Sequence, residues 1–174
     1  MARDLPDFIS PELFTFLLPE QRDDIQDSLR LLDHFELPAP NGLNHPRDFS
    51  FIVFPMGRCY EGFLKLFFMH LGVLQDENYH SKFFRIGRSF NPDIKMHLRD
   101  EVWVYDDVQR FTNEDVARRL WQVWLSARNH LFHYFPDDRY EVSYNEAKKL
   151  VEEVIAVMED AIHTSSAQSS NKNT

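Results

Sequence analysis

Arg128 and His133 form the residue pair in this chain that best suits acid–base chemistry at a phosphate. Both lie near the end of a predicted helix, where five residues correspond to a rise of about 7.5 Å. An Arg side chain spans that distance, so both head groups can meet one phosphate. Imidazole accepts and donates protons near neutral pH, and guanidinium presents a planar fork to phosphate oxygens. The helix dipole also favours the charged form of His133.

Two other interpretations of this segment remain open. His130 and His133 are spaced as in an HxxH metal pair, but two imidazoles need further ligands and the sequence places none nearby. The basic side chains could instead only bind the last carbonyl groups of the helix. An isolated R-x4-H pattern does not decide between these.

A second charged cluster lies on an otherwise apolar helix predicted for residues 48–71. Arg58, Glu61 and Lys65 fall at positions i, i+3 and i+7, on one helical face. A charge on a buried helix is costly unless it is paired. We therefore expect Glu61 to lie within hydrogen-bond reach of Arg58 or Arg128. The alternative is a solvent-exposed stripe with an i,i+4 pair between Glu61 and Lys65.

Basic and aromatic residues alternate between positions 79 and 99, which carry a net charge of +4. This composition suits single-stranded RNA, through phosphate pairing and base stacking. The alternative is a loop whose aromatic rings anchor it to the core. The basic residues are Lys82, Arg85, Arg88, Lys95 and Arg99, and the aromatic residues are Tyr79, Phe83, Phe84 and Phe90.

The elements that position these residues are predicted to be helical. Ser10 and Pro11 predict a capped helix to about Leu18, and Pro19 opens a second one to about Phe35, with Asp24 on its water-facing side. The central helix, 48–71, contains Pro55, which kinks it or marks its start, and Gly72 ends it.

The helix that carries Arg128 is predicted to begin at a capping box, Thr112 to Asp115, and to end near His133 or Tyr134, before Pro136. A second capping box, Ser143 to Glu146, opens the final helix. Between the central helix and the Arg128 helix we predict a long basic loop that holds a short strand pair around 83–86. Residues 92–108 are ambiguous: 93–99 suit a helical turn, and 102–105 suit a short strand. The predicted fold is an all-α bundle of four or five helices.

Length and composition predict one domain, residues 1–163, with N-terminal helices and a loop over 1–47, a core over 48–163 and a disordered Ser/Asn-rich tail over 164–174. The single cysteine, Cys59, excludes a disulfide framework. The net charge of −9 argues against coating nucleic acid by bulk charge. Neither a signal peptide nor a membrane span is predicted, so we expect a cytoplasmic protein.

Together the two charged clusters resemble those of the HEPN superfamily, whose all-α domains include many ribonucleases with an R-x4-6-H motif. The residue directly after the Arg of this motif is polar, and Asn129 fits that position. The resemblance extends to the C-terminal HEPN domain of the RnlA/LsoA (RNase LS) toxins. On its first core helix, that family has a pattern that looks like an apolar stretch, a Pro and then R-x-x-E-G-x-L-K. Residues 54–65 (FPMGRCYEGFLK) match this pattern. Its second element, R-x-x-L-F-H, matches residues 128–133. The resemblance covers roughly residues 48–135.

This resemblance implies a metal-independent endoribonuclease of a toxin–antitoxin or phage-defence system, without a cofactor. The RNA 2′-hydroxyl would attack the adjacent phosphate, leaving 2′,3′-cyclic phosphate and 5′-hydroxyl ends. The implied partners are RNA, a second copy that meets the first through the R-x4-H helices, and an antitoxin protein. The implied catalytic residues are Arg58, Glu61, Arg128 and His133, and we assign substrate binding to Lys65, Lys82, Arg85, Arg88 and Asn129.

The resemblance has two limits. The RnlA-type toxins carry additional N-terminal domains, whereas only about 45 residues precede the match here. Related HepT-type toxins have a motif that looks like R-x4-H-x-Y, in which the Tyr can be adenylylated by a partner. In this chain Phe135 occupies the position of that Tyr, and Tyr134 precedes it by one residue. The alternative function is a non-catalytic HEPN interaction module that binds a nucleotide or a partner protein.

Overall fold

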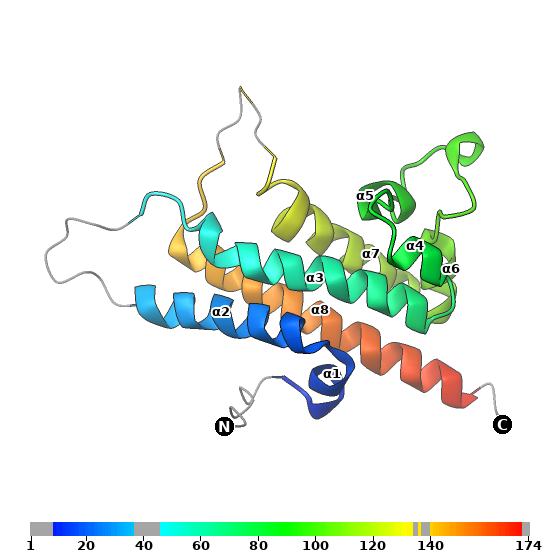
Figure 1. The fold of residues 1–174 in the computed structure, drawn as a ribbon, viewed down its shortest axis with the longest axis horizontal. Coiled ribbons are helices and arrows are strands. Elements are labelled where there is room, and N and C mark those ends of the chain that lie inside the picture. The colour runs from blue at the N-terminus through cyan, green and yellow to red at the C-terminus, as the bar shows by residue number, and fades with distance from the viewer. Residues whose placement is uncertain (1–8, 37–45, 134–135, 137–139, 172–174) are drawn as a thin grey trace, which may run out of the picture.

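The central element of the fold is α3 (Ser50–His70), an apolar helix packed between other helices. The computed structural model describes residues 9–36, 46–133, 136 and 140–171. Figure 1 shows α3 running alongside α2 (Pro19–Phe35) and α8 (Tyr144–Asn171), while α7 (Glu114–Trp124) packs against α8. Its inward side chains include several rings that are wholly buried: Tyr60, Phe63, Phe67 and Phe68. Burial of such rings supplies most of the stability that holds the charged residues of α3 in place.

The two N-terminal helices form where their caps predict. Ser10 caps α1 (Pro11–Phe16), because its Oγ accepts a hydrogen bond from Leu13 N–H at 3.0 Å. The Ser10 N–H and hydroxyl also donate to the Glu159 carboxylate, 2.6 Å each, which ties α1 to α8. The bounds of α2 agree with the prediction from Pro19 to Phe35.

Pro55 lies inside α3 and neither begins nor ends it. A proline in a helix interior disturbs the local hydrogen bonds. Here the next amide, Met56 N–H, donates to the Ser28 hydroxyl of α2 at 3.0 Å. Beyond the last turn of α3, Gly72 adopts a φ of +71°, the left-handed conformation expected of a residue that ends a helix.

The segment between α3 and α7 differs from its prediction. In the described part of the chain it contains short helices and no strand: α4 (Asp76–Tyr79), α5 (Ile86–Ser89), the 3-10 turn η1 (Met96–Leu98) and α6 (Tyr105–Phe111). The strands predicted around 83–86 and 102–105 are wrong. Val104 and Val108, four residues apart, are both buried, and this helical spacing outweighs the local β-branched composition.

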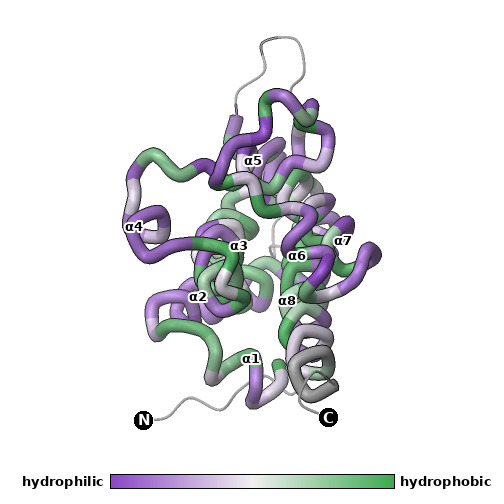
Figure 2. Tube along the Cα trace, turned by 90° about the vertical axis from the view of Figure 1, so that its right-hand side faces the viewer, coloured by the Kyte–Doolittle hydropathy of each residue, from purple (hydrophilic) through white to green (hydrophobic). Residues whose placement is uncertain are grey.

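The fold is all-α in the described residues, with eight α-helices, five of them seven residues or longer, instead of the four or five predicted. Figure 2 shows long stretches of hydrophobic residues along the traces of α3 and α8, and most of these residues are buried. No helix in the described part of the chain is both long and apolar enough to span a membrane.

The start of α7 also differs from its prediction. Asn113, one residue after Thr112, caps α7 by accepting from Val116 N–H at 2.9 Å. The Thr112 hydroxyl is instead used to end α6, donating to the Val108 carbonyl at 2.7 Å. By contrast, the predicted capping box of Ser143 and Glu146 is confirmed at the start of α8, where the Ser143 N–H donates to the Glu146 carboxylate at 2.8 Å.

The C-terminal helix α8 continues to Asn171, through most of the predicted disordered tail. Ser165 is buried and its hydroxyl donates to the Ile162 carbonyl at 3.0 Å, so the polar composition is compatible with a helix here. Residues 172–174 lie outside the described residues.

Replacing Gly57 of α3 with Val should lower the free energy of unfolding by about 2–3 kcal/mol, because overpacking a close contact is costly. A Cβ at Gly57 would lie 2.8 Å from the Phe132 ring and 3.0 Å from the Ala127 carbonyl oxygen. Gly87→Val is the control, since a Cβ there meets only Trp124 Nε1, at 3.6 Å. Urea denaturation measures both, and equal losses would contradict the close approach at Gly57.

Candidate functional site

A widened helical turn carries Arg128. Directly after α7 the backbone forms a single π-helical turn, η2 (Leu125–Asn129), in which His130 N–H donates to the Leu125 carbonyl at 2.9 Å. Such turns are rare and frequently occur at functional sites. The turn lies against Gly57, whose missing side chain lets the Ala127 carbonyl and the Phe132 ring approach α3.

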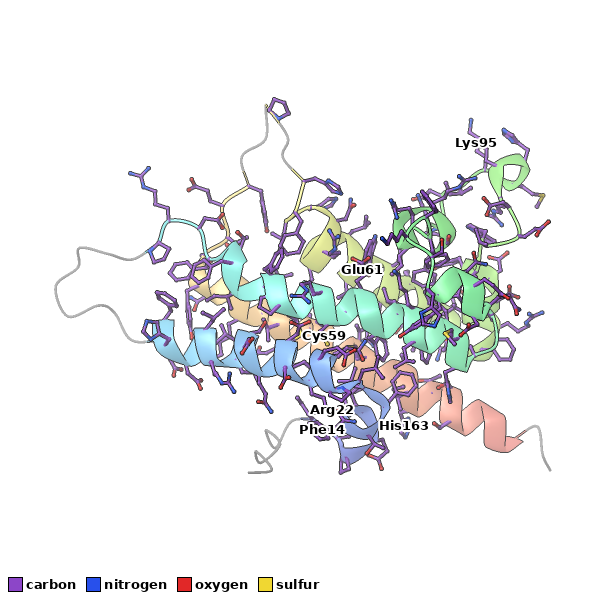
Figure 3. All side chains as sticks on the ribbon, viewed as in Figure 1. Phe14, Arg22, Cys59, Glu61, Lys95 and His163 are labelled. Atoms are coloured by element: carbon purple, nitrogen blue, oxygen red, sulfur yellow. The ribbon has the colours of Figure 1, made fainter. Side chains whose placement is uncertain are left out.

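Arg128 binds Glu61 across the seam between η2 and α3. Its Nε donates to Glu61 Oε2 at 3.0 Å, joining residues 67 positions apart in sequence. This confirms the prediction that Glu61 lies within hydrogen-bond reach of Arg58 or Arg128. Figure 3 shows Glu61 on the edge of α3 nearest the segment that continues α7.

The Glu61–Arg128 ion pair is half-buried, and this burial determines how much the pair contributes to the free energy of unfolding. The side chains are 29% and 34% exposed for Arg128 and Glu61. The expectation of a costly buried charge on this helix therefore holds only in part, because the Glu61 carboxylate is partly open to solvent. For a pair open to solvent we expect about 1 kcal/mol. The contact therefore contributes more to the orientation of Arg128 than to global stability.

The outer part of the Arg128 guanidinium remains open to a ligand. Its Cζ lies 5.6 Å from the Trp124 ring centroid and 5.4 Å from that of Phe132, so two rings flank the cation. In the described part of the chain, only Nε of this guanidinium donates to a protein acceptor. The two terminal NH₂ groups can therefore donate to an anion such as a phosphate.

Arg58 pairs with a residue that sequence reasoning placed in water. Its Nη1 lies 3.8 Å from Asp24 Oδ1 of α2, while the Asp24 side chain is only 18% exposed. Burial raises the pKa of Asp24 above its ordinary value, and the Arg58 guanidinium offsets part of that rise. Among the described residues Glu61 forms no ion pair with Arg58 or Lys65, so the i,i+4 stripe is not formed. Arg58 is 65% exposed, one turn from Glu61.

His133 does not share a helix with Arg128, contrary to the prediction. Residues 130–132 form turns after η2, and His133 follows them with an exposed side chain. Its neighbour Phe132 nevertheless contacts Arg128, so the chain next to His133 lies at the guanidinium. The early helix end follows from the π-turn at the contact with Gly57. Tyr134 and Phe135 lie outside the described residues.

The predicted binding residues fall into two groups. Lys65 and Asn129 are half-exposed, Lys65 one turn after Glu61 on α3 and Asn129 next to Arg128. Lys82, Arg85 and Arg88 lie at or near α5, whose Gly87 lies beside Trp124. The structure thus brings α5 close to the ring that flanks Arg128.

The basic segment is less positive than its own sequence indicates. Arg88 pairs with Asp100 at 2.6 Å, and Arg99 with Asp106 at 3.4 Å, both acids lying outside the predicted segment. The Arg85 guanidinium donates to main-chain carbonyls of its own turn. Lys82 and Lys95 are exposed.

Three aromatic residues near Arg128 have no role among the predicted site residues. Trp124 and Phe132 flank Arg128, and Phe54 contacts Phe132 with ring centroids 5.1 Å apart. A signal was present, because Phe54, Gly57 and Glu61 are spaced for one face of α3, and Trp124 and Phe132 are each four residues from Arg128.

A separate cavity of about 510 Å³ lies between α2 and α8, away from Arg128. Its lining includes the apolar Leu29 and Ile155, one lysine, Lys148, and the carboxylates of Asp33, Glu36, Glu152 and Glu159, so its charge is negative. This charge would repel RNA. Cys59 is likewise unsuited to chemistry: it is buried, and burial raises the pKa of its thiol well above the ordinary value.

No family model, curated protein or solved structure matches this chain.

A double-mutant cycle should measure the Glu61–Arg128 contact. We expect Glu61→Gln and Arg128→Gln, alone and together, to give a coupling free energy of about 1 kcal/mol in low salt, decreasing in 1 M salt. The control cycle uses Asp27 and Arg30, an exposed pair within α2, for which about 0.3 kcal/mol is expected. Chemical denaturation provides the four stabilities of each cycle, and a coupling near zero for Glu61 and Arg128 would contradict the contact.

Proposed function

We propose that this chain is a metal-independent endoribonuclease of the HEPN type, a toxin or phage-defence effector that resembles the RnlA/LsoA toxins. The observation that carries the proposal is the hydrogen bond between Glu61 and Arg128. It joins the two motifs on which the resemblance rests, although they are separated by 67 residues. A chance R-x4-H sequence gives no reason for such a contact.

The proposed reaction is an internal transesterification. The 2′-oxygen of one nucleotide forms a bond to the adjacent phosphorus, and the bond from that phosphorus to the 5′-oxygen of the next nucleotide breaks. A proton leaves the 2′-hydroxyl, and another is delivered to the departing 5′-oxygen. The products are a 2′,3′-cyclic phosphate and a 5′-hydroxyl, and no oxidant or water is consumed.

The side chains divide these tasks. The terminal NH₂ groups of Arg128 bind the non-bridging oxygens, where negative charge develops. Glu61 holds Nε and so fixes the plane of the guanidinium, and Asn129 adds a polar contact. His133 transfers a proton, as base or acid. Arg58, which is 65% exposed and lies one turn from Glu61 on α3, adds positive charge. Lys65, with Lys82, Arg85 and Arg88 at or near α5, binds neighbouring phosphates.

The reaction needs both a general acid and a general base. One R-x4-H motif supplies a single imidazole, that of His133, which can serve as one of the two. Two protomers that face each other about a two-fold axis would supply both. We therefore propose a homodimer through the segments around Arg128 and His133. A protein that is monomeric at assay concentration and still cleaves at full rate would contradict this arrangement.

Purified protein should cleave RNA in excess EDTA and leave 5′-hydroxyl ends, which polynucleotide kinase can label directly. Arg128→Lys and His133→Ala should each lower the cleavage rate at least a hundredfold, because they remove the planar fork and the proton carrier. Their circular dichroism should match that of the unaltered protein, and their loss of stability should stay within about 1 kcal/mol, the size expected for the Glu61–Arg128 contact.

The control variants are His130→Ala and Arg30→Ala, which should cleave normally. His130 is exposed and would be required if His130 and His133 bound a metal ion, and Arg30 lies on the outer face of α2. A strict need for a divalent ion, or full activity in folded Arg128→Lys, would overturn the proposed function.

A further inference from the structure

A row of aromatic side chains leads from the Arg128–Glu61 contact along α3. Phe54, Gly57 and Glu61 lie on one face of this helix, at positions i, i+3 and i+7. Phe132 crosses above Gly57, edge-on to Phe54 with an interplanar angle of 88° and ring centroids 5.1 Å apart. The Phe132 ring is also 5.4 Å from Arg128 Cζ. The order along the seam is therefore Phe54, Phe132 and the open guanidinium.

Phe54 is unusually exposed for a residue with such neighbours. It is 49% exposed, and its one ring contact in the described part of the chain is with Phe132. Phe51, one turn earlier on the same helix, is 36% exposed but contacts both Phe35 and Phe49. Isolated exposed apolar residues are common on proteins. Phe54 differs because its ring partner, Phe132, lies beside a guanidinium whose terminal NH₂ groups have no protein acceptor in the described residues.

We propose that Phe54, supported by Phe132, is a stacking site for one unpaired nucleobase next to the phosphate held by Arg128. This inference rests on the proposed function and deepens it, because it names single-stranded RNA as the substrate class. The face of a base stacks on an aromatic ring, and this face is accessible only where the base has left the double helix. Glu61 is about 10.5 Å along the helix from Phe54, so base and phosphate belong to the same or adjacent nucleotides.

A non-cleavable probe tests this site separately from catalysis. The probe is a 2′-O-methyl tetranucleotide that carries the fluorescent base 2-aminopurine. It lacks the attacking hydroxyl, so its binding is measured without reaction. Stacking of the fluorescent base on Phe54 should quench its emission, and the quenching curve gives the dissociation constant.

Substitutions at position 54 separate stacking from simple apolar contact. We expect Phe54→Ala and Phe54→Leu to weaken binding about tenfold, whereas Phe54→Trp should bind as well as the unaltered protein. Phe51→Ala is the matched control, an exposed Phe on the same helix outside the row, and should bind normally. Melting midpoints of all variants confirm that they are folded.

Three results would overturn the stacking site: unchanged binding in Phe54→Ala, equal binding by the Leu and Trp variants, or dissociation of a dimer in Phe54→Ala measured by sedimentation. The last would assign Phe54 to a contact between copies. If the unaltered protein cleaves ordinary RNA but Phe54 variants bind the probe normally, only this inference fails. If it binds the probe through Phe54 and cleaves no RNA, the proposed ribonuclease activity fails instead.

Discussion

The hydrogen bond between Glu61 and Arg128 is the constraint on which the site depends. It is a single contact of 3.0 Å between two half-exposed side chains, so its energy is small compared with that of the core. Its effect is geometric. An Arg side chain has many rotamers, and a carboxylate on Nε together with two nearby rings limits the orientations of the guanidinium. The terminal donors then point where a phosphate can be bound without further ordering.

The remainder of the fold makes that contact possible. The buried rings of α3 fix this helix against its neighbours, and the buried Tyr60 hydroxyl, which donates to the Leu120 carbonyl at 2.7 Å, ties it to α7. Gly57 allows the two backbones to approach, and the π-turn of η2 presents Arg128 toward Glu61. A glycine and an irregular helical turn at one contact both carry a cost in stability, which proteins commonly accept at functional positions.

Much of the fold could be predicted from the sequence because long helices have strong local signals. Ser10, Pro19 and the Ser143–Glu146 box mark starts, and apolar periodicity marks buried faces. The segment between α3 and α7 could not be predicted, since helices of four to seven residues have too few turns for a clear period. The π-turn also has no sequence signal, and so the end of the Arg128 helix was misplaced.

The motif residues of the site could be predicted from the sequence. The ion pairs and ring contacts that depend on tertiary packing could not. The spacing of Arg58, Glu61 and Lys65 predicts a shared face, and one of the two predicted partners of Glu61 was Arg128. No local sequence pattern shows that Asp24 of α2 forms an ion pair with Arg58, or that Asp100 forms one with Arg88. These ion pairs exist only after the helices pack. The same holds for the aromatic row, whose members come from α3 and from the turns after η2.

In the proposed reaction Glu61 acts by positioning the Arg128 guanidinium. The most direct test is the single-turnover cleavage rate of Glu61→Gln, with RNA affinity and stability measured on the same preparation. Gln keeps the shape and removes the charge that holds the guanidinium. We expect Glu61→Gln to cleave at least tenfold more slowly than the unaltered protein. Its dissociation constant for RNA should change less than threefold, and its free energy of unfolding should fall by about 1 kcal/mol. Cleavage at the rate of the unaltered protein would contradict this role of Glu61.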